Sequence, residues 1–201
     1  MSANSNYIRP SEHLIDLWGK RNPTFEKRYE QSVLRVLSDY GTGASEFTES
    51  KGKVFGAGYE VLIIAFFIGL YSNQRLPLSD DKDDIKPNGV GQPIDKWGNL
   101  DSKKLRKAYP NLRRYIFMAL VAKTEDIDWI ALEKGELEVS KVVSKLIDTM
   151  EEYINYGLFT IEDKLKEDSG YFYSDRSFLN LFIKIVDEKN DIKELTEAEP
   201  L

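Results

Sequence analysis

Cysteine is absent from the 201-residue chain, and histidine occurs once, as His13. The lack of cysteine excludes disulfides, thiolate metal ligands and cysteine nucleophiles. A typical zinc site needs several cysteine or histidine ligands, and a serine triad would have to use His13, so the sequence favours neither. We therefore expect no bound metal and no cofactor.

Long hydrophobic runs are also lacking. The most apolar passage, FGAGYEVLIIAFFIGLYSNQR at 55–75, contains eleven consecutive uncharged residues from Val61 to Tyr71. As a helix they would rise about 17 Å, whereas a bilayer core is about 30 Å thick. The N-terminus, MSANSNYIRPSEH, has no apolar core of the kind a signal peptide needs. We expect no membrane association and a cytoplasmic location.

The composition is that of a globular protein, with 41% hydrophobic, 31% charged and 12% aromatic residues. No segment alternates polar and apolar residues as a strand would, whereas several repeat apolar residues every three or four positions. The sequence therefore predicts an all-α, single-domain bundle of six or seven helices over residues 1–188. An acidic, frayed tail is expected at 189–201.

The central element of this bundle is expected at 58–72, because a helix that is apolar all round is buried all round. A long helix at 137–166 should pack along it. Further helices are predicted within 11–20, 23–40, 111–124 (largely buried) and 178–186, and a long irregular loop at 73–100. The core stripe of the long helix comprises Val139, Val143, Leu146, Met150, Tyr153, Gly157, Ile161 and Leu165.

Charge is distributed unevenly around a net value of −6. Residues 1–40 carry +1, residues 41–100 carry −2, residues 101–123 carry +6 and residues 124–201 carry −11. A pI near 5.0 argues against a dedicated nucleic-acid protein, but the basic segment stands out.

This basic segment interleaves cations with aromatic residues, a pattern that suits phosphate backbones and exposed bases. It can equally be a solvated face, a surface for a protein partner, or an internal match for the acidic C-terminal third. We treat Arg75 and this segment as the candidate binding residues: Lys103, Lys104, Arg106, Lys107, Tyr109, Arg113 and Arg114.

Glu60 is the one charged residue within the apolar helix. In the first turn it is stabilised by the helix dipole. If buried, it needs a partner. Arg75 lies about 22 Å away along one straight helix, so each must find a counterpart elsewhere, and Arg113 and Arg114 are plausible partners for Glu60.

Carboxylate chemistry is a further hypothesis. Glu60 and Asp95 are its candidate catalytic residues, because paired acids are what glycoside hydrolysis needs. Loop acids and stacking aromatics could complete such a site: Glu46, Glu49, Tyr71, Trp97 and Tyr109. The acidic run DDKDD at 80–84 could attract a divalent cation, but it lacks the EF-hand spacing and reads as a solvated loop.

The stretches YIRPSEHLIDLW, FGAGYE, AFFIGLY, GQPIDKWGNLDSKK and AYPNLRRYIFMALVAKT together cover most of the chain. In these stretches the sequence resembles a family of bacterial all-helical proteins, some of which carry a glucoamylase-type glycoside hydrolase label. The resemblance implies a helical bacterial protein. The glucoamylase fold is a much larger double-layered helical barrel, and none of its catalytic motifs matches residues here.

The function favoured by the sequence is a non-catalytic, cytoplasmic binding or assembly module that acts on a protein partner, for example within a multi-protein bacterial system. The alternatives are a metal-independent, carboxylate-based hydrolase, and a nucleic-acid-associated protein that uses residues 103–114.

Overall fold

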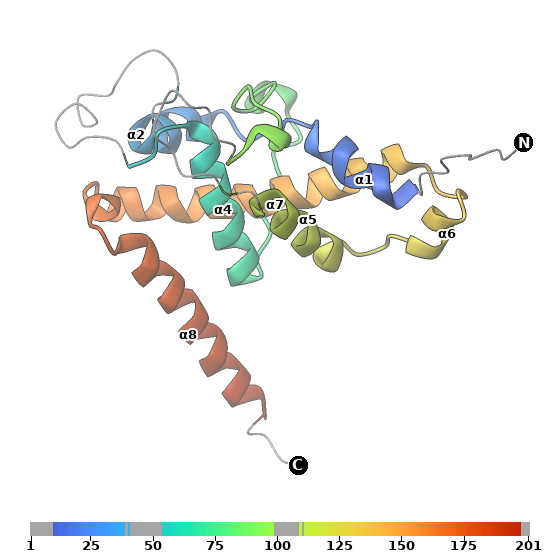
Figure 1. The fold of residues 1–201 in the computed structure, drawn as a ribbon. Helices are drawn as coiled ribbons and strands as arrows, with labels where there is room; N and C mark the ends of the chain where they lie inside the picture. The colour runs from blue at the N-terminus through green and yellow to red at the C-terminus, as the bar shows by residue number, and fades with distance from the viewer. Residues whose placement is uncertain (1–9, 39, 41–53, 99–108, 110, 198–201) are drawn as a thin grey trace, which may run out of the picture. The chain divides into compact units, whose positions relative to one another are not determined.

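A computed structural model describes residues 10–38, 40, 54–98, 109 and 111–197. Within these ranges there is no β-strand, which confirms the all-α prediction. Seven α-helices are seen there (Figure 1): α1 (Pro10–Gly19), α2 (Arg35–Leu37), α4 (Gly58–Ser72), α5 (Leu112–Lys123), α6 (Trp129–Glu133), α7 (Val139–Glu167) and α8 (Ser177–Glu197). None of the described helices has the length and apolar content needed to cross a membrane.

The chain divides into two compact units, each made of two separate stretches of sequence. Unit 1 comprises Met1–Pro23 and Gly91–Met150, and unit 2 comprises Thr24–Val90 and Glu151–Leu201. Helix α7 continues through the boundary at 150, so its first part belongs to unit 1 and its second to unit 2.

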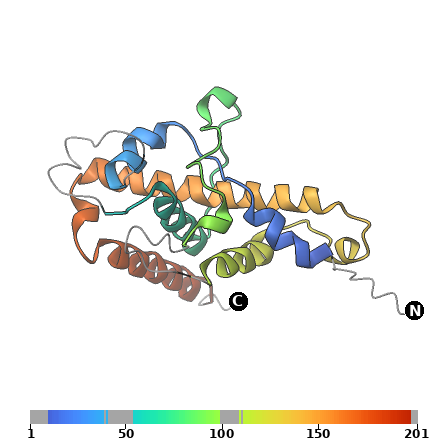
Figure 2. The ribbon, with the colours of Figure 1, turned by 45° about the horizontal axis from the view of Figure 1, so that its top comes forward.

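Unit 1 contains α1, α5, α6 and the first part of α7, which lie at one end of that helix (Figure 2). Its core is aromatic and aliphatic. The ring of Trp18 is fully buried, with its centroid 5.4 Å from that of Phe117 on α5. A short 3-10 helix, Ile94–Lys96, is fixed to the end of α1 because the Ile94 N–H donates to the Arg21 carbonyl at 3.1 Å.

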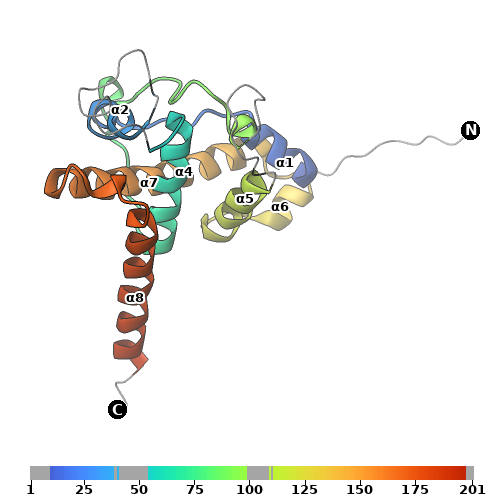
Figure 3. The same cartoon turned by 60° about the vertical axis from the view of Figure 1, so that its left-hand side comes forward.

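Unit 2 is built around α4, which crosses the second part of α7 (Figure 3). The observed bounds of α4 are those predicted, and Asn73, which caps its C-terminus, has a left-handed φ of 53°. Two glycines allow the crossing. A Cβ at Gly69 would lie 2.3 Å from the Tyr153 carbonyl oxygen, and one at Gly157 would lie 1.9 Å from the Ala65 carbonyl oxygen. Backbone therefore packs directly on backbone here.

The helix predicted at 23–40 is shorter than expected, and this prediction was wrong at both ends, because α2 already ends at Leu37. Residues 21–25 have no helical structure, and residues 30–34 form a π-helix, Glu30–Leu34, that leads into α2. The backbone before it is held in other pairings. The Lys86 N–H donates to the Phe25 carbonyl at 2.8 Å, and the Lys27 N–H donates to the Asp84 carbonyl at 2.7 Å. These bonds replace those that a helix would have made.

The C-terminal boundary also differs from the prediction. Helix α8 continues to Glu197, past the expected end of the helical domain at 188. The residues that follow 188 are mainly Lys, Glu, Asp and Leu, several of which have high helix propensity. An ion pair between Lys184 and Glu188, at 3.6 Å and four residues apart, supports the preceding turn.

Candidate functional site

Most of the predicted basic segment falls outside the described residues: Lys103, Lys104, Arg106 and Lys107 are not placed. The described residues on either side of 99–108, Gly98 and Tyr109, lie in contact. The Tyr109 N–H donates to the Gly98 carbonyl at 2.9 Å, and a Cβ at Gly98 would lie 3.2 Å from that of Tyr109. Gly98 and Tyr109 therefore lie side by side, directly before α5.

Helix α5 carries the part of the basic segment that is described. Arg113 and Arg114 lie in its first turn, where the helix dipole disfavours cations, and the first turn contains no acid. Asn111, the N-cap residue, makes no side-chain capping bond. The N-terminus of α5 thus gathers positive charge.

The sequence predicted a largely buried α5, and this prediction was wrong. Within α5 only Ile116 and Leu120 are buried. The opposite side is open to solvent, with Tyr115 61% and Met118 57% exposed. We call this side the α5 face; its exposed members are Arg114, Tyr115, Met118 and Ala122. Tyr109, 55% exposed, precedes the helix.

Asp95 and Arg113 lie on the same side of unit 1. Both flank Gly19 at the end of α1: a Cβ there would lie 3.5 Å from the Asp95 Cβ and 3.7 Å from an Arg113 guanidinium nitrogen. Asp95 belongs to the 3-10 helix Ile94–Lys96. Arg113 therefore packs against the unit with part of its length, whereas Arg114 is exposed.

Glu60 caps its own helix. Its Oε2 accepts hydrogen bonds from the Gly56 N–H at 2.8 Å and the Ala57 N–H at 3.1 Å. A carboxylate at this position satisfies free N–H groups and interacts favourably with the dipole. The contacts support the structural interpretation of Glu60, which belongs to unit 2, whereas Asp95 belongs to unit 1.

The other candidate residues also have structural contacts. Arg75 forms an ion pair with Glu152 on α7 at 3.7 Å. Trp97, proposed as a stacking platform, is 3% exposed, and its Nε1 donates to the Gln92 carbonyl at 3.1 Å. That proposal was wrong, because the ring is enclosed. Glu46 and Glu49 lie outside the described residues.

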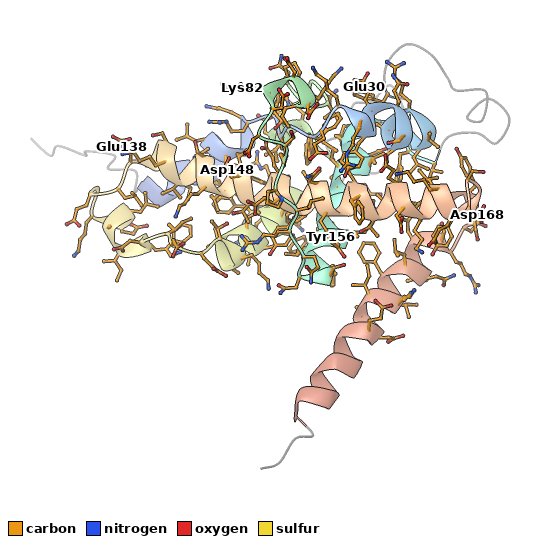
Figure 4. The ribbon with its side chains drawn as sticks, turned by 180° about the vertical axis from the view of Figure 1, so that it is seen from behind. Glu30, Lys82, Glu138, Asp148, Tyr156 and Asp168 are labelled. Carbon is orange, nitrogen blue, oxygen red and sulfur yellow. The ribbon has the colours of Figure 1, made fainter. Side chains whose placement is uncertain are left out.

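The acidic run at 80–84 forms a small self-capped turn. Asp81 accepts a hydrogen bond from the Asp83 N–H at 2.8 Å, and Ser79 donates to Asp84 at 2.9 Å. Lys82 begins the 3-10 helix of this run (Figure 4). No group of three or more acidic, histidine or cysteine side chains able to hold a metal ion occurs among the placed residues.

Sequence reasoning missed a buried polar network in unit 2. Asn155 of α7 is fully buried, and its amide nitrogen lies 3.1 Å from Glu26 Oε1 and 3.2 and 3.0 Å from the carbonyl oxygens of Leu76 and Pro77. It joins α7 to the segment after α4 and to the start of unit 2. The sequence signal was a lone amide on α7, between Tyr153 and Gly157 of the apolar stripe.

Charged groups surround this network. Arg28 pairs with Glu26 at 2.7 Å and donates to the Tyr29 hydroxyl at 2.5 Å. Burial raises the pKa of Tyr29 well above its ordinary value, so the phenol stays protonated. Burial alone would raise the pKa of Glu162, but Lys166 at 2.7 Å lowers it overall. These pairs neutralise one another and give the network a structural role.

A second ionic group lies on the π-helix. Glu30, labelled in Figure 4, accepts hydrogen bonds from Lys86 at 2.6 Å and from Arg35 at 3.0 Å. The bond from Lys86 lowers the pKa of Glu30 below its ordinary value. This group holds the loop after α4 against the π-helix.

The last surface of note is on α8. Leu179, Ile183 and Val186 are 59%, 49% and 40% exposed. Val186, which the sequence predicted within the last helix at 178–186, lies at the surface of α8. Helices α5 and α8 together carry five of the ten large exposed apolar side chains on the described part of the chain, and α8 alone carries three.

No family model matches the chain. Comparison with curated proteins and with solved structures likewise finds no similar protein.

Proposed function

We propose that the protein is a non-catalytic binding module and that the α5 face is its recognition surface. The observation that supports this proposal is the composition of that face: Tyr115 and Met118 are exposed beside Arg114, on a helix without a single acidic residue. Tyrosine, methionine and arginine are enriched in protein interfaces, and arginine and tyrosine supply many hot spots.

The chemistry of the face defines the partner. The exposed side chains of Tyr115 and Met118 need apolar groups opposite them in a partner. The arginines of the first turn of α5 need carboxylates. The partner is therefore an acidic, amphipathic protein segment. A cytoplasmic location and a role in assembly with other proteins remain part of the proposal.

A direct test measures binding of two fluorescent probes to the full chain. The first is an acidic, leucine-containing helical peptide, and the second is nucleic acid, as single- and double-stranded DNA and RNA, at about 50 and about 200 mM salt. The test variant carries Arg114→Glu and Met118→Ser. The control is Lys134→Glu, which changes an exposed charge elsewhere in unit 1.

The proposal expects the peptide to bind the wild type and the control, and to bind the test variant at least about tenfold more weakly. Absence of peptide binding would contradict it. Nucleic-acid binding that falls steeply with salt, and is lost when Lys103, Lys104 and Lys107 are all changed to glutamate, would favour the nucleic-acid alternative instead. Exposed Tyr109 and Tyr115 would then be base-stacking residues.

A further inference from the structure

Helix α8 has two apolar sides, of which its own unit covers one. Leu181 is 4% exposed, the Phe182 ring lies 5.7 Å from that of Tyr71 on α4, and the Phe178 ring stacks on Phe172 at 4.6 Å. These contacts hold the first turns of α8 against the rest of unit 2.

The other side consists of Leu179, Ile183 and Val186, which we call the α8 stripe. Their spacing of four and three residues places them in one line along the helix. All three are at least 40% exposed. Single exposed apolar residues are ordinary, but a row of branched aliphatic side chains on one helix side is typical of a contact surface.

Acidic side chains lie at the C-terminal end of the α8 stripe, where Asp187 and Glu188 directly follow Val186. Glu188 pairs with Lys184 of the preceding turn at 3.6 Å, so Asp187 is the acid offered to the arginines of the α5 face. On α5, Arg113 and Arg114 directly precede Tyr115 and Met118, at the N-terminal end. An antiparallel alignment of the two helices therefore brings acids beside arginines while the apolar rows face each other.

The two rows also match in length. The row from Tyr115 to Ala122 and the row from Leu179 to Val186 each span eight residues, and the seven steps of each row extend over about 10 Å of helix. In the antiparallel alignment, the acidic residues that follow the α8 stripe would also lie near the N-terminus of α5, which is the positive end of its helix dipole.

From this match we infer that the chain self-associates: the α8 stripe of one copy docks antiparallel on the α5 face of a second copy. The inference rests on the proposed function, for which it names the partner segment. Each copy offers both surfaces, so each copy can take part in two such contacts.

Sedimentation equilibrium of the full chain, from about 1 to about 200 μM, tests this inference. We expect concentration-dependent association, weakened at least about tenfold by Ile183→Asp and about fivefold or more by Arg114→Glu. Asp187→Arg combined with Arg114→Glu should restore part of the loss. The control is Ile130→Asp, a residue of α6 that is 69% exposed and should leave association unchanged.

Mixing the Ile183→Asp and Arg114→Glu variants distinguishes a contact between the α8 stripe and the α5 face from other modes of self-association. The Ile183→Asp copy retains an intact α5 face, and the Arg114→Glu copy retains an intact α8 stripe, so the mixture should associate more strongly than either variant alone. A contact between two α8 helices would be insensitive to Arg114→Glu. Circular dichroism of each variant checks that the fold is kept.

A chain that stays monomeric throughout this range, or an association unaffected by Arg114→Glu, would overturn the inference. These results differ from a failure of the proposed function. A monomeric chain that still binds the acidic peptide through Arg114 and Met118 leaves the α5 face as a binding surface and removes only the second copy as its partner.

Discussion

Gly157 of α7 lies against the carbonyl group of Ala65 on α4, so closely that a Cβ at 157 would stand 1.9 Å from that oxygen. Gly69 and Tyr153 repeat the relationship about one turn away, with the glycine now on α4 and a corresponding distance of 2.3 Å. Both atoms approached belong to the backbone, so no side-chain rotation can relieve the overlap. The position of the crossing therefore depends on the absence of two side chains.

We predict that Gly157→Ala destabilises the fold by about 3 kcal/mol or more, although alanine is the better helix former by about 1 kcal/mol. Chemical denaturation of the variant measures the loss. Gly91→Ala provides the comparison: a Cβ there meets nothing within 4 Å, and only its φ of +73° is strained, so we expect a loss of roughly 1 kcal/mol. Equal effects at the two positions would show that the crossing is not this close.

Helix α4 should be the element most sensitive to truncation. Phe66 is fully buried and its ring meets that of Tyr153 edge-on at 6.0 Å. Phe66→Ala should cost about 3–5 kcal/mol through lost transfer energy and the cavity left behind. Phe159→Ala, at a position that is 45% exposed, should cost much less in the same denaturation experiment. A change below about 1 kcal/mol at Phe66 would mean that α4 is peripheral.

The sequence predicted these helices because their signals are local. A run of apolar residues without a polar side gave the bounds of α4, and apolar spacing gave α7 to within two residues at its N-terminal end. The role of Gly157 was not predictable in this way. It occurs within the apolar stripe, and only the partner helix reveals that its lack of a side chain is what matters.

Asn155 should be important for the stability of unit 2. Asn155→Ala leaves two buried carbonyl groups and Glu26 without their donor, and we expect a loss of about 2–3 kcal/mol. Asn155→Asp should be worse at neutral pH, because a second carboxylate would face Glu26 and two carbonyl oxygens, and should recover partly in acid. Asn180→Ala, on the exposed side of α8, is the control. Equal stability of Asn155→Ala and the wild type would contradict this account.

The ionic group at Glu30 should make stability depend on pH. Folding lowers the pKa of Glu30 from its ordinary value of 4.5, so the folded state binds this proton less readily than the unfolded state does. The stabilisation is then complete above that ordinary value and is lost as the pH falls through the lower, folded pKa. Glu30→Gln should therefore flatten the decline in unfolding free energy below about pH 4.5. Matching pH profiles for the variant and the wild type would be inconsistent with this role.

The candidate site was less predictable than the fold. The composition of 101–123 singled out Arg113 and Arg114 as candidate binding residues, but the pattern NLRRYIFMALVAKT is apolar enough to suggest a largely buried helix. The side of α5 that meets the core depends on α1, because the Trp18 ring of α1 packs against the Phe117 ring of α5. The exposure of Met118 is decided by that contact, far away in sequence. Likewise, α8 has apolar residues on two sides, and only packing against Tyr71 of α4 determines which side is left open.

The interleaving of the two units has a consequence for how the protein is made. Unit 1 takes its residues from the first and third stretches of the chain, and unit 2 from the second and fourth. Unit 1 is complete only when the ribosome has synthesised Met150. By then the α4 segment has already been synthesised. The part of α7 that packs on α4, at Tyr153 and Gly157, is synthesised only afterwards. The most apolar helix therefore waits for its main contact until late in translation. Such long-range pairing slows folding and extends the time during which apolar surface is exposed, so the nascent chain should depend on chaperones between the synthesis of Ser72 and that of Gly157.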